Sequence, residues 1–218
     1  MFKNQWILPI VGTLLAGLLF FFAFKQSNHP APLKSLPYFG PRNPSATDSG
    51  YHKVGPFVLI NQFGDTVRER EFEGCIYVTD FFFTTCQSIC PIMSNRMANV
   101  VDAFGDKPNV KFLSVTVNPE HDSVNVLLDY AKAHGAVKGK WHFCTGAKPH
   151  LYELARKGFL LNAAQGDGGP NDFIHTQNFA LIDPDQHIRG YYDGTDSLDV
   201  LRLIKDIRVL DLETMGKK

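Results

Sequence analysis

The sequence predicts a mixed α/β domain, a sheet flanked by helices, preceded by one transmembrane helix. Two runs rich in aromatic and β-branched residues, 75–83 and 110–117, are almost continuously apolar, as strands buried on both faces are. Between them, residues 91–104 carry apolar side chains at helical spacing before Gly105, so the three segments predict a β-α-β unit with parallel strands. The third observation is an uncharged run over residues 6–24.

The composition narrows the classes of function. Twenty-two Lys and Arg balance 22 Asp and Glu, which argues against a nucleic-acid binder with a broad basic face and against a disordered acidic chain. Four cysteines in 218 residues are too few for a small disulfide-stapled scaffold. With 44% hydrophobic residues, a sizeable core is available. We expect an ordinary globular domain that binds no nucleic acid.

The uncharged run, which starts at Trp6 and stops at Phe24, predicts a membrane anchor. Its 19 residues would form a helix of about 28 Å, close to the thickness of the hydrocarbon layer. A buried core helix is one alternative, but the run is not amphipathic. A cleaved signal peptide is the other, but its apolar region is usually about 7–15 residues, and Phe-Ala-Phe-Lys at 22–25 is a poor cleavage site. We expect an uncleaved single-pass anchor.

Residues on either side of this run suggest the domain organisation. One lysine precedes the run and three positive residues follow it before position 50, so the positive-inside count does not favour export of the C-terminal part. The absence of an Arg- and Ser-rich presequence before Trp6 favours a bacterial protein. Five prolines within 25–50 predict an extended tether. We expect an anchor over 1–25, a tether over 26–50, a folded domain over 51–213 and a tail over 214–218.

The remaining elements follow from turn and capping residues. Asp122 or Ser123 is expected to cap the helix before Gly135, and Asp196 or Ser197 the last helix. An Asp-Pro-Asp-Gln turn predicts a second hairpin. The expected order is a hairpin at 55–67, strand 75–83, helix 91–104, strand 110–117, a helix before 135, strand 140–145, helix 149–157, a hairpin at 178–192 and a helix to about 210. This order is that of a thioredoxin-like fold.

A Cys86-x-x-x-Cys90-Pro motif stands between the first buried strand and the next helix, where α/β folds gather ligands. A helix N-terminus stabilises thiolate over thiol. Helical positions four apart have Cβ atoms about 5–6 Å from each other, whereas a disulfide needs about 3.5–4.5 Å. The pair therefore predicts either a labile disulfide or two thiolates converging on one metal ion. Two idle buried thiols are the plainer alternative.

His175 is the candidate for a third ligand. It follows a Gly-rich loop and precedes the strand expected from 178, and in a thioredoxin-like layout the loop entering that strand faces the cysteine turn. Taken alone, it would be an ordinary polar loop residue. Two thiolates and one imidazole suit Cu(I), whereas structural zinc would need a fourth ligand. The other seven histidines are expected at the surface or as caps, and Cys75 and Cys144 as small buried hydrophobes.

Four features of residues 51–210 together are characteristic. They are Phe-Phe-Thr-Thr-Cys86-x-x-x-Cys90-Pro, Ser-Val-Thr-Val-Asn118-Pro-Glu-His-Asp122, Trp141 with Gly146, and His175 ahead of Leu-Ile-Asp183-Pro-Asp185. With them the chain resembles the SCO/SenC family of copper-handling proteins of respiratory membranes. The resemblance implies that Cys86, Cys90 and His175 bind copper, as Cu(I) with Cu(II) left open. It also implies delivery of copper to, or reduction of the cysteines of, the binuclear copper centre of cytochrome c oxidase.

The resemblance further implies a bacterial inner-membrane protein whose C-terminal domain faces the periplasm. Its expected partners are the copper-containing subunit of a respiratory oxidase and a thiol reductant or other copper carrier. Asn118 stands where the family usually has Asp. The absence of that carboxylate favours a function weighted towards thiol redox chemistry. On this resemblance, the first hypothesis is a metallochaperone, which is not an enzyme. The alternatives are a thiol-disulfide oxidoreductase, in which Cys86 attacks and Cys90 resolves, and a scaffold module.

Overall fold

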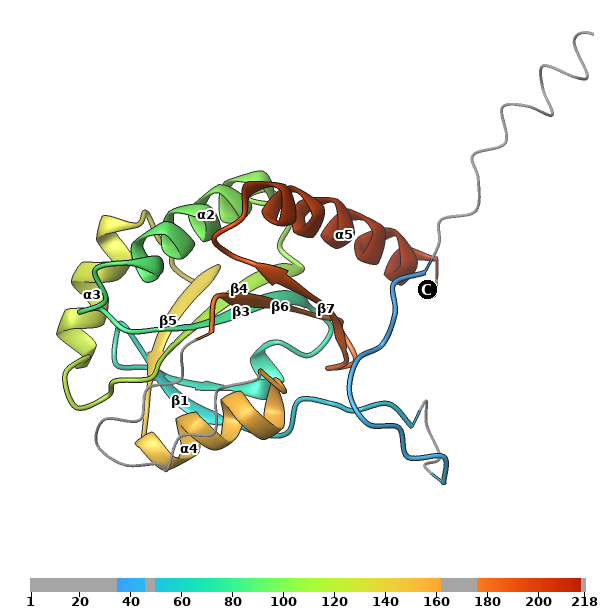
Figure 1. Cartoon of the computed structure of the whole chain (residues 1–218), viewed down its shortest axis with the longest axis horizontal. Coiled ribbons are helices and arrows are strands. Elements are labelled where there is room, and N and C mark those ends of the chain that lie inside the picture. The colour runs from blue at the N-terminus through green and yellow to red at the C-terminus, as the bar shows by residue number, and fades with distance from the viewer. Residues whose placement is uncertain (1–34, 46–49, 162–175, 217–218) are drawn as a thin grey trace, which may run out of the picture. The chain divides into compact units, whose positions relative to one another are not determined.

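A single mixed sheet organises the part of the chain that the computed structural model describes, residues 35–45, 50–161 and 176–216 (Figure 1). The strand order is β2-β1-β5-β4-β3-β6-β7. β3, β4 and β5 run parallel, and the outer pairs β1–β2, β1–β5, β3–β6 and β6–β7 are antiparallel. The strands are β1 (Val58–Asn61), β2 (Thr66–Arg68), β3 (Ile76–Phe82), β4 (Val110–Thr116), β5 (Trp141–Thr145), β6 (Asn178–Ile182) and β7 (Ile188–Asp193).

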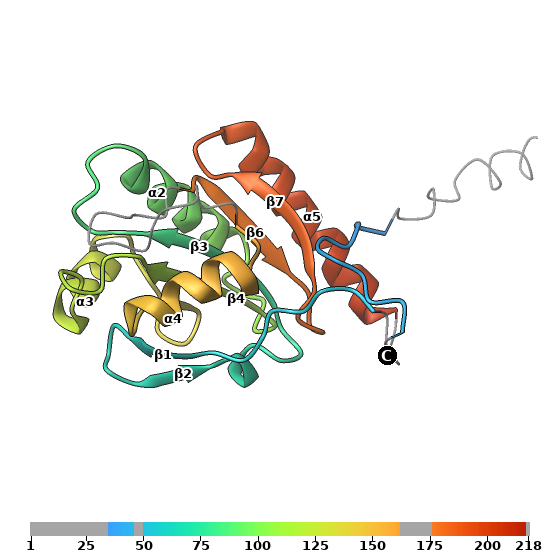
Figure 2. The same cartoon turned by 60° about the horizontal axis from the view of Figure 1, so that its bottom comes forward.

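Helices cover both faces of this sheet. The three longest pack on one face, and a short α-helix that continues as a π-helix packs on the other (Figures 1 and 2). The first face carries α2 (Ile89–Ala103), α3 (Val124–Ala133) and α5 (Ser197–Met215), and the second carries α4 (Lys148–Glu153) and η2 (Leu154–Gly158); a 3-10 turn, η1 (Glu69–Glu71), follows β2. The mixed sheet flanked by helices is the fold class that the sequence predicts.

The central strand β3 shows why its sequence is almost entirely apolar. All seven of its residues are buried. Successive side chains of a strand point to opposite faces, and here both faces are covered. Ile76, Val78 and Phe82 pack with α2 and α5, whereas Tyr77 and Phe81 pack with η2 and the β1–β2 hairpin. The β-α-β unit and both hairpins predicted from the sequence are present.

Three element ends differ from the sequence predictions. Neither predicted residue caps α3 with its side chain: Ser123 occupies the N-cap without a side-chain hydrogen bond, and the Asp122 carboxylate is bound to Thr84 and Thr116. The predicted helix 149–157 starts as α4 and loosens into the π-helical η2. α5 continues past Leu210 to Met215, because its last turns contact the rest of the domain. Asp196 caps α5 as expected, accepting a hydrogen bond from the Leu198 N–H at 2.8 Å.

The segment 35–39, here called the strap, lies against β7 and α5. Its backbone amide at Phe39 donates to the Ile188 carbonyl at 2.9 Å, and that at Leu36 donates to Glu213 Oε1 at 2.7 Å. The Tyr38 ring stacks on Tyr51 with centroids 4.5 Å apart. As the prolines predict, residues 35–45 form no helix, but from Ser35 onward the chain is in contact with the domain.

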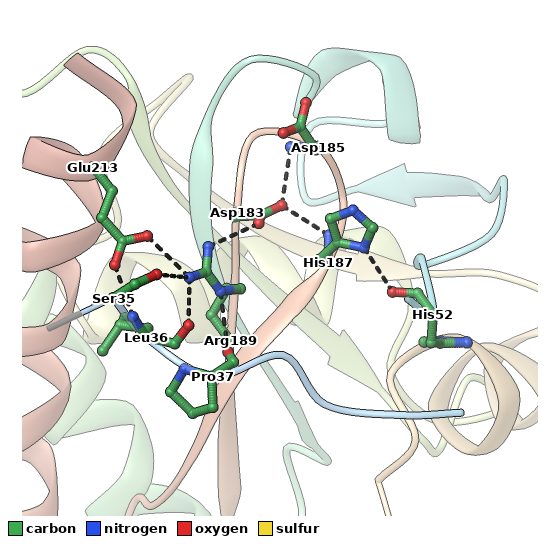
Figure 3. A network of polar contacts seen from close by, with 9 residues as sticks. All are labelled: Ser35, Leu36, Pro37, His52, Asp183, Asp185, His187, Arg189 and Glu213. Atoms are coloured by element: carbon green, nitrogen blue, oxygen red, sulfur yellow. Dashed lines mark hydrogen bonds and ion pairs between the residues drawn. The ribbon is translucent and has the colours of Figure 1, made fainter. Parts of the chain in front are cut away.

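Arg189 of β7 is the centre of these contacts (Figure 3). Its side chain is 1% exposed and lies between Asp183 at 3.1 Å and Glu213 at 2.9 Å. It also donates to the backbone carbonyls of Pro37 at 3.0 Å and Leu36 at 2.6 Å. A buried charge must be paired and hydrogen-bonded, and the strap supplies acceptors that the sheet and α5 do not. The strap therefore supplies the remaining hydrogen-bond acceptors for the buried Arg189 side chain.

The predicted anchor at 6–24 lies outside the described residues. Within the part of the chain that the structure describes, no helix is both long and apolar enough to cross a membrane.

Candidate metal centre

The two cysteines of the motif lie where β3 gives way to α2. Cys86 follows the strand in a turn whose amide donates to the Phe83 carbonyl at 3.2 Å, and Cys90 is the second residue of α2. Pro91 is tolerated in this first helical turn because amides there have no intrahelical acceptor. Cys86 is half-buried and Cys90 is 3% exposed. Both are free thiols, so the structure represents the reduced pair.

Their surroundings make the two sulfurs unequal. Burial raises the pKa of Cys86, but backbone hydrogen bonds from Cys90 and Ser88, with those of the two side chains, outweigh it and lower that pKa to about 7. Burial raises the pKa of Cys90 to about 12, and the hydrogen bond it makes to Cys86 adds to this. The Cys90 thiol therefore donates to the Cys86 thiolate. The hydrogen bond between the two side chains makes the sulfurs neighbours, and neighbouring sulfurs can serve one metal ion or, with local adjustment, one disulfide.

A buried carboxyl group lies beneath this pair. Asp80 of β3 is 1% exposed, accepts a hydrogen bond from Ser114 Oγ at 2.5 Å, and is among the charges that raise the pKa of Cys90. Ser114 in turn accepts from the Trp141 indole at 2.9 Å. Burial raises the pKa of Asp80 itself to about 7. A negative charge at Asp80 therefore opposes a second thiolate at Cys90.

Asp122 holds the loop that leads into the cysteine turn. Its carboxylate is fully buried and accepts from the Thr84 amide at 3.2 Å, and both the Thr84 and Thr116 hydroxyls donate to it. His121 Nδ1 lies 3.2 Å from the same group. The loop after β4 is thereby fixed to the loop after β3. Sequence reasoning missed this role, because an Asp before a helix is more simply explained as a cap.

The structure brings Cys86 and Cys90 together, and the third predicted ligand, His175, lies outside the described residues. In the described part of the chain, no group of three His, Cys, Asp or Glu side chains could hold a metal ion. The expectation of a buried thiol is confirmed for Cys144 in β5 and wrong for Cys75, which is half-buried just before β3.

The expectation of surface histidines is wrong at two positions. His142 in β5 is 9% exposed and His187 is 4% exposed. His187 Nδ1 lies 3.0 Å from the His52 carbonyl, so it joins the Asp183 turn to the segment before β1 (Figure 3). Neither histidine is close to the cysteine motif in the sequence, and both pack within the sheet.

Comparison with known proteins identifies relatives of similar sequence and fold. A SCO1/SenC family lipoprotein from Bacillus anthracis is 26% identical, with a TM-score of 0.65 over 73% of this chain and 95% of that one. BsSco, described as a member of the Sco family of cytochrome c oxidase assembly proteins with a disulfide switch, is 28% identical, with a TM-score of 0.60 over 72% and 93%.

Arabidopsis thaliana ScoI, solved with copper bound, is 24% identical, with a TM-score of 0.57 over 71% of this chain and 97% of that one, a likeness that shows the fold. The sequence profile described as SCO1/SenC matches residues 45–210, which span the sheet, the cysteine motif and most of α5. With the thioredoxin-like sheet and the reduced cysteine pair at the start of α2, this match shows that the chain belongs to the SCO1/SenC family.

Proposed function

We propose that this protein binds copper through Cys86, Cys90 and His175 and serves the assembly of the copper centre of cytochrome c oxidase. The observation that carries the proposal is the placement of Cys86 and Cys90 together at the N-terminus of α2, where the pKa of Cys86 is lowered to about 7. Thiolates are the ligands that Cu(I) prefers, and a thiolate already formed near neutral pH binds the ion without a large proton cost. The ion is cargo to be delivered to that centre; the other form of this role is that the protein prepares the recipient's cysteines.

His175 is the third ligand in this proposal. It is separated by only two residues from β6, and β6 pairs directly with β3, the strand that leads to the cysteine turn. Because β6 is antiparallel to β3, the residues that enter β6 lie at the edge of the sheet where β3 ends. This topology favours His175 as the imidazole that completes a three-ligand site. BsSco, a relative, is described as an assembly protein, which supports the same target process.

A thiol-disulfide reductase is the second candidate, favoured by the unequal acidities of the two cysteines. The Cys86 thiolate would attack a partner disulfide and form a mixed disulfide, releasing one partner thiolate. Cys90 would then lose its proton and attack Cys86 Sγ, which releases the second partner thiol and leaves a Cys86–Cys90 disulfide. Two electrons pass to the partner, and a thiol reductant restores the pair. Asn118, in place of the family's usual carboxylate, is compatible with this role.

The proposal includes a single-pass anchor at 6–24, a periplasmic domain and a location at the bacterial inner membrane. The charge-free run of membrane-spanning length supports the anchor, and a family member described as a lipoprotein supports membrane association. The tether in this proposal covers 26–34, because residues from Ser35 onward contact β7 and α5.

Replacing His175 separates the two candidate functions. His175→Ala is expected to weaken Cu(I) retention by at least about 100-fold, because losing a ligand costs more than losing an outer-shell partner. It should leave stoichiometric dithiol exchange nearly unchanged. The measurements are competition against a chromophoric Cu(I) chelator and reduction of a model disulfide, both without oxygen.

His150→Ala is the matched control. This half-buried histidine lies on α4, on the other face of the sheet, and accepts only one long hydrogen bond, from the Val58 amide at 3.4 Å. Both readouts should stay at the parent values. If His175→Ala holds Cu(I) as tightly as the parent, the ligand assignment is wrong. If it abolishes dithiol exchange while sparing copper, the reductase becomes the better reading.

A further inference from the structure

The solvent face of α5 has an unusual composition. From Leu198 onward, every exposed side chain of this helix is either large and apolar or positively charged. Four of the eight exposed large hydrophobic residues in the described part of the chain lie here, with exposures from 50% to 73%. These exposed residues, here called the outer stripe, are Leu198, Leu201, Arg202, Lys205, Arg208, Leu212 and Met215.

The four acidic residues of α5 all have partners within the fold, and two of them, Asp199 and Asp206, pair with Arg202 of the stripe at 2.7 and 3.7 Å. Asp206 accepts from the Tyr192 hydroxyl at 2.8 Å, and Asp211 accepts from Asn109 at 2.8 Å. Glu213 binds Arg189 and the strap, and Asp199 accepts from the Asp193 amide at 2.7 Å. Each carboxylate is thus used within the fold. Arg202 is thus paired within the helix, and in the described part of the chain Lys205 and Arg208 are the positive charges of the outer stripe that no carboxylate of α5 pairs with.

The spacing of the stripe makes it continuous along the helix. Positions 198, 201, 205, 208, 212 and 215 are separated by three and four residues, which places them on one side of an α-helix. The opposite side is occupied by buried Val200, Leu203, Ile207 and Leu210. Apolar side chains interleaved with Lys and Arg along one helix face are typical of helices that lie in a membrane interface.

The strap fixes where the chain leaves α5 toward the proposed anchor. The Leu36 amide and Arg189 both bind Glu213, in the last turns of α5. Only residues 25–34 separate Ser35 from the end of the apolar run. Fully extended, this connection spans about 40 Å. The last turns of α5 therefore cannot move further than that from the bilayer, and so short a link keeps the local concentration of membrane surface high.

We propose that the outer stripe of α5 lies on the anionic surface of the membrane that holds the anchor. Leu198, Leu201, Leu212 and Met215 enter the boundary between headgroups and acyl chains, and Lys205 and Arg208 contact lipid phosphates. This inference rests on the anchor in the proposed function.

Such an orientation has a consequence for the cysteine turn. β6 and β7 pair so that Asn178 meets Asp193, and α5 starts only four residues after Asp193. α5 therefore begins near the edge of the sheet where β3 ends and the cysteines lie, and it finishes beside the strap at the other edge (Figure 1). A helix held flat on the membrane keeps the cysteine turn at the level of the surface, where a membrane-embedded recipient would meet it.

Tryptophan quenching by brominated lipids tests this contact in the full chain. The chain is reconstituted in vesicles of phosphatidylcholine and phosphatidylglycerol with brominated acyl chains, and flotation checks insertion. Leu201→Trp places the reporter on the stripe, at a position 60% exposed. Val137→Trp is the matched control, 54% exposed and outside α5. Both variants keep the native Trp6 and Trp141, so the difference between them reports the added residue.

The proposal predicts that Leu201→Trp emission shifts to shorter wavelength and loses intensity to bromine, whereas Val137→Trp shows only the background. Adding Lys205→Glu and Arg208→Glu should reverse most of that loss. Equal quenching of the two reporters in floated vesicles would overturn the contact and leave the anchor intact. A blue shift without bromine quenching would also overturn it, in favour of a second copy of the chain. Failure to float would refute the anchor itself.

Discussion

Replacing Arg189 with methionine is expected to lower the free energy of unfolding by about 3–5 kcal/mol, the range typical of a buried ion pair that loses one partner. Asp183 is 2% exposed and Glu213 has 13% of its side chain exposed, so both carboxylates lose a partner that water cannot fully replace. The carbonyls of Leu36 and Pro37 lose their donor as well. Tyr38, whose ring lies 4.1 Å from the guanidinium carbon, loses a cation–π contact.

Two further variants identify the cause of that loss. Arg189→Lys keeps the charge but not the planar fork, so its stability should fall between those of the parent and Arg189→Met. Adding Glu213→Gln to Arg189→Met should recover part of the loss, because one unpaired carboxylate is removed. Guanidinium unfolding of the full chain in detergent, followed by near-UV circular dichroism, gives these values. A cost below about 1 kcal/mol for Arg189→Met would show that the strap network does not hold the domain together.

Asp80→Asn is expected to stabilise the metal-free, reduced domain increasingly as the pH rises. Burial is the main reason that the pKa of Asp80 rises from 3.8 to about 7; the hydrogen bonds from Ser114 and the backbone oppose it. The folded state therefore holds this proton more tightly than the unfolded state. The resulting stabilisation is complete below pH 4 and is lost as the pH passes through 7.

The shift sets an upper limit of about 4 kcal/mol on this effect, at 1.36 kcal/mol per pKa unit. The quantity to measure is the difference in unfolding free energy between Asp80→Asn and the parent from pH 4 to 9, since other titrating groups cancel in it. It should rise across that interval and level off above pH 8. Ser114→Ala, which removes the donor to Asp80, should delay the ionisation to higher pH. A difference that does not change with pH would contradict a protonated, buried Asp80.

Regular elements were predictable from sequence because each depends on its own residues. β3 is almost entirely apolar because both faces are covered, and the Asp-Pro-Asp-Gln turn sets the β6–β7 hairpin. The cysteine turn was predictable for the same reason, since a strand, a Cys-x-x-x-Cys-Pro motif and a helix follow in order. These signals are local, and the fold preserves them.

Contacts between distant segments left no such signal. In the sequence, Arg189 resembles an ordinary polar residue of a hairpin strand. In the structure its buried side chain binds Ser35 and Leu36 of the strap, 154 and 153 positions earlier, and so makes the strap part of the domain. Asp122 resembles a helix cap and instead holds the loop before the cysteines. The stripe on α5 was hidden for a similar reason, because only the contacts of the helix's own acids show that Arg202 is paired and that no carboxylate of the helix pairs with Lys205 or Arg208 in the described part of the chain.

The site could be described from sequence only as far as its two sulfurs. The motif predicted that Cys86 and Cys90 would meet, but not that Cys90 would be the buried donor and Cys86 the thiolate. That asymmetry comes mainly from burial, which raises the pKa of Cys90, and from hydrogen bonds of Cys90 and Ser88, which lower the pKa of Cys86; the Asp80 charge adds to the first effect. It makes Cys86 the sulfur presented to an incoming ion or to a partner disulfide.

Titration of the full chain with Cu(I) tests the central claim most directly. The reduced protein, in detergent and without oxygen, competes with a chromophoric chelator, while near-UV circular dichroism verifies the fold. Our account predicts one equivalent of Cu(I) held against the chelator, and its loss in both Cys86→Ser and Cys90→Ser. A folded, fully reduced chain that leaves all the copper with the chelator would contradict it.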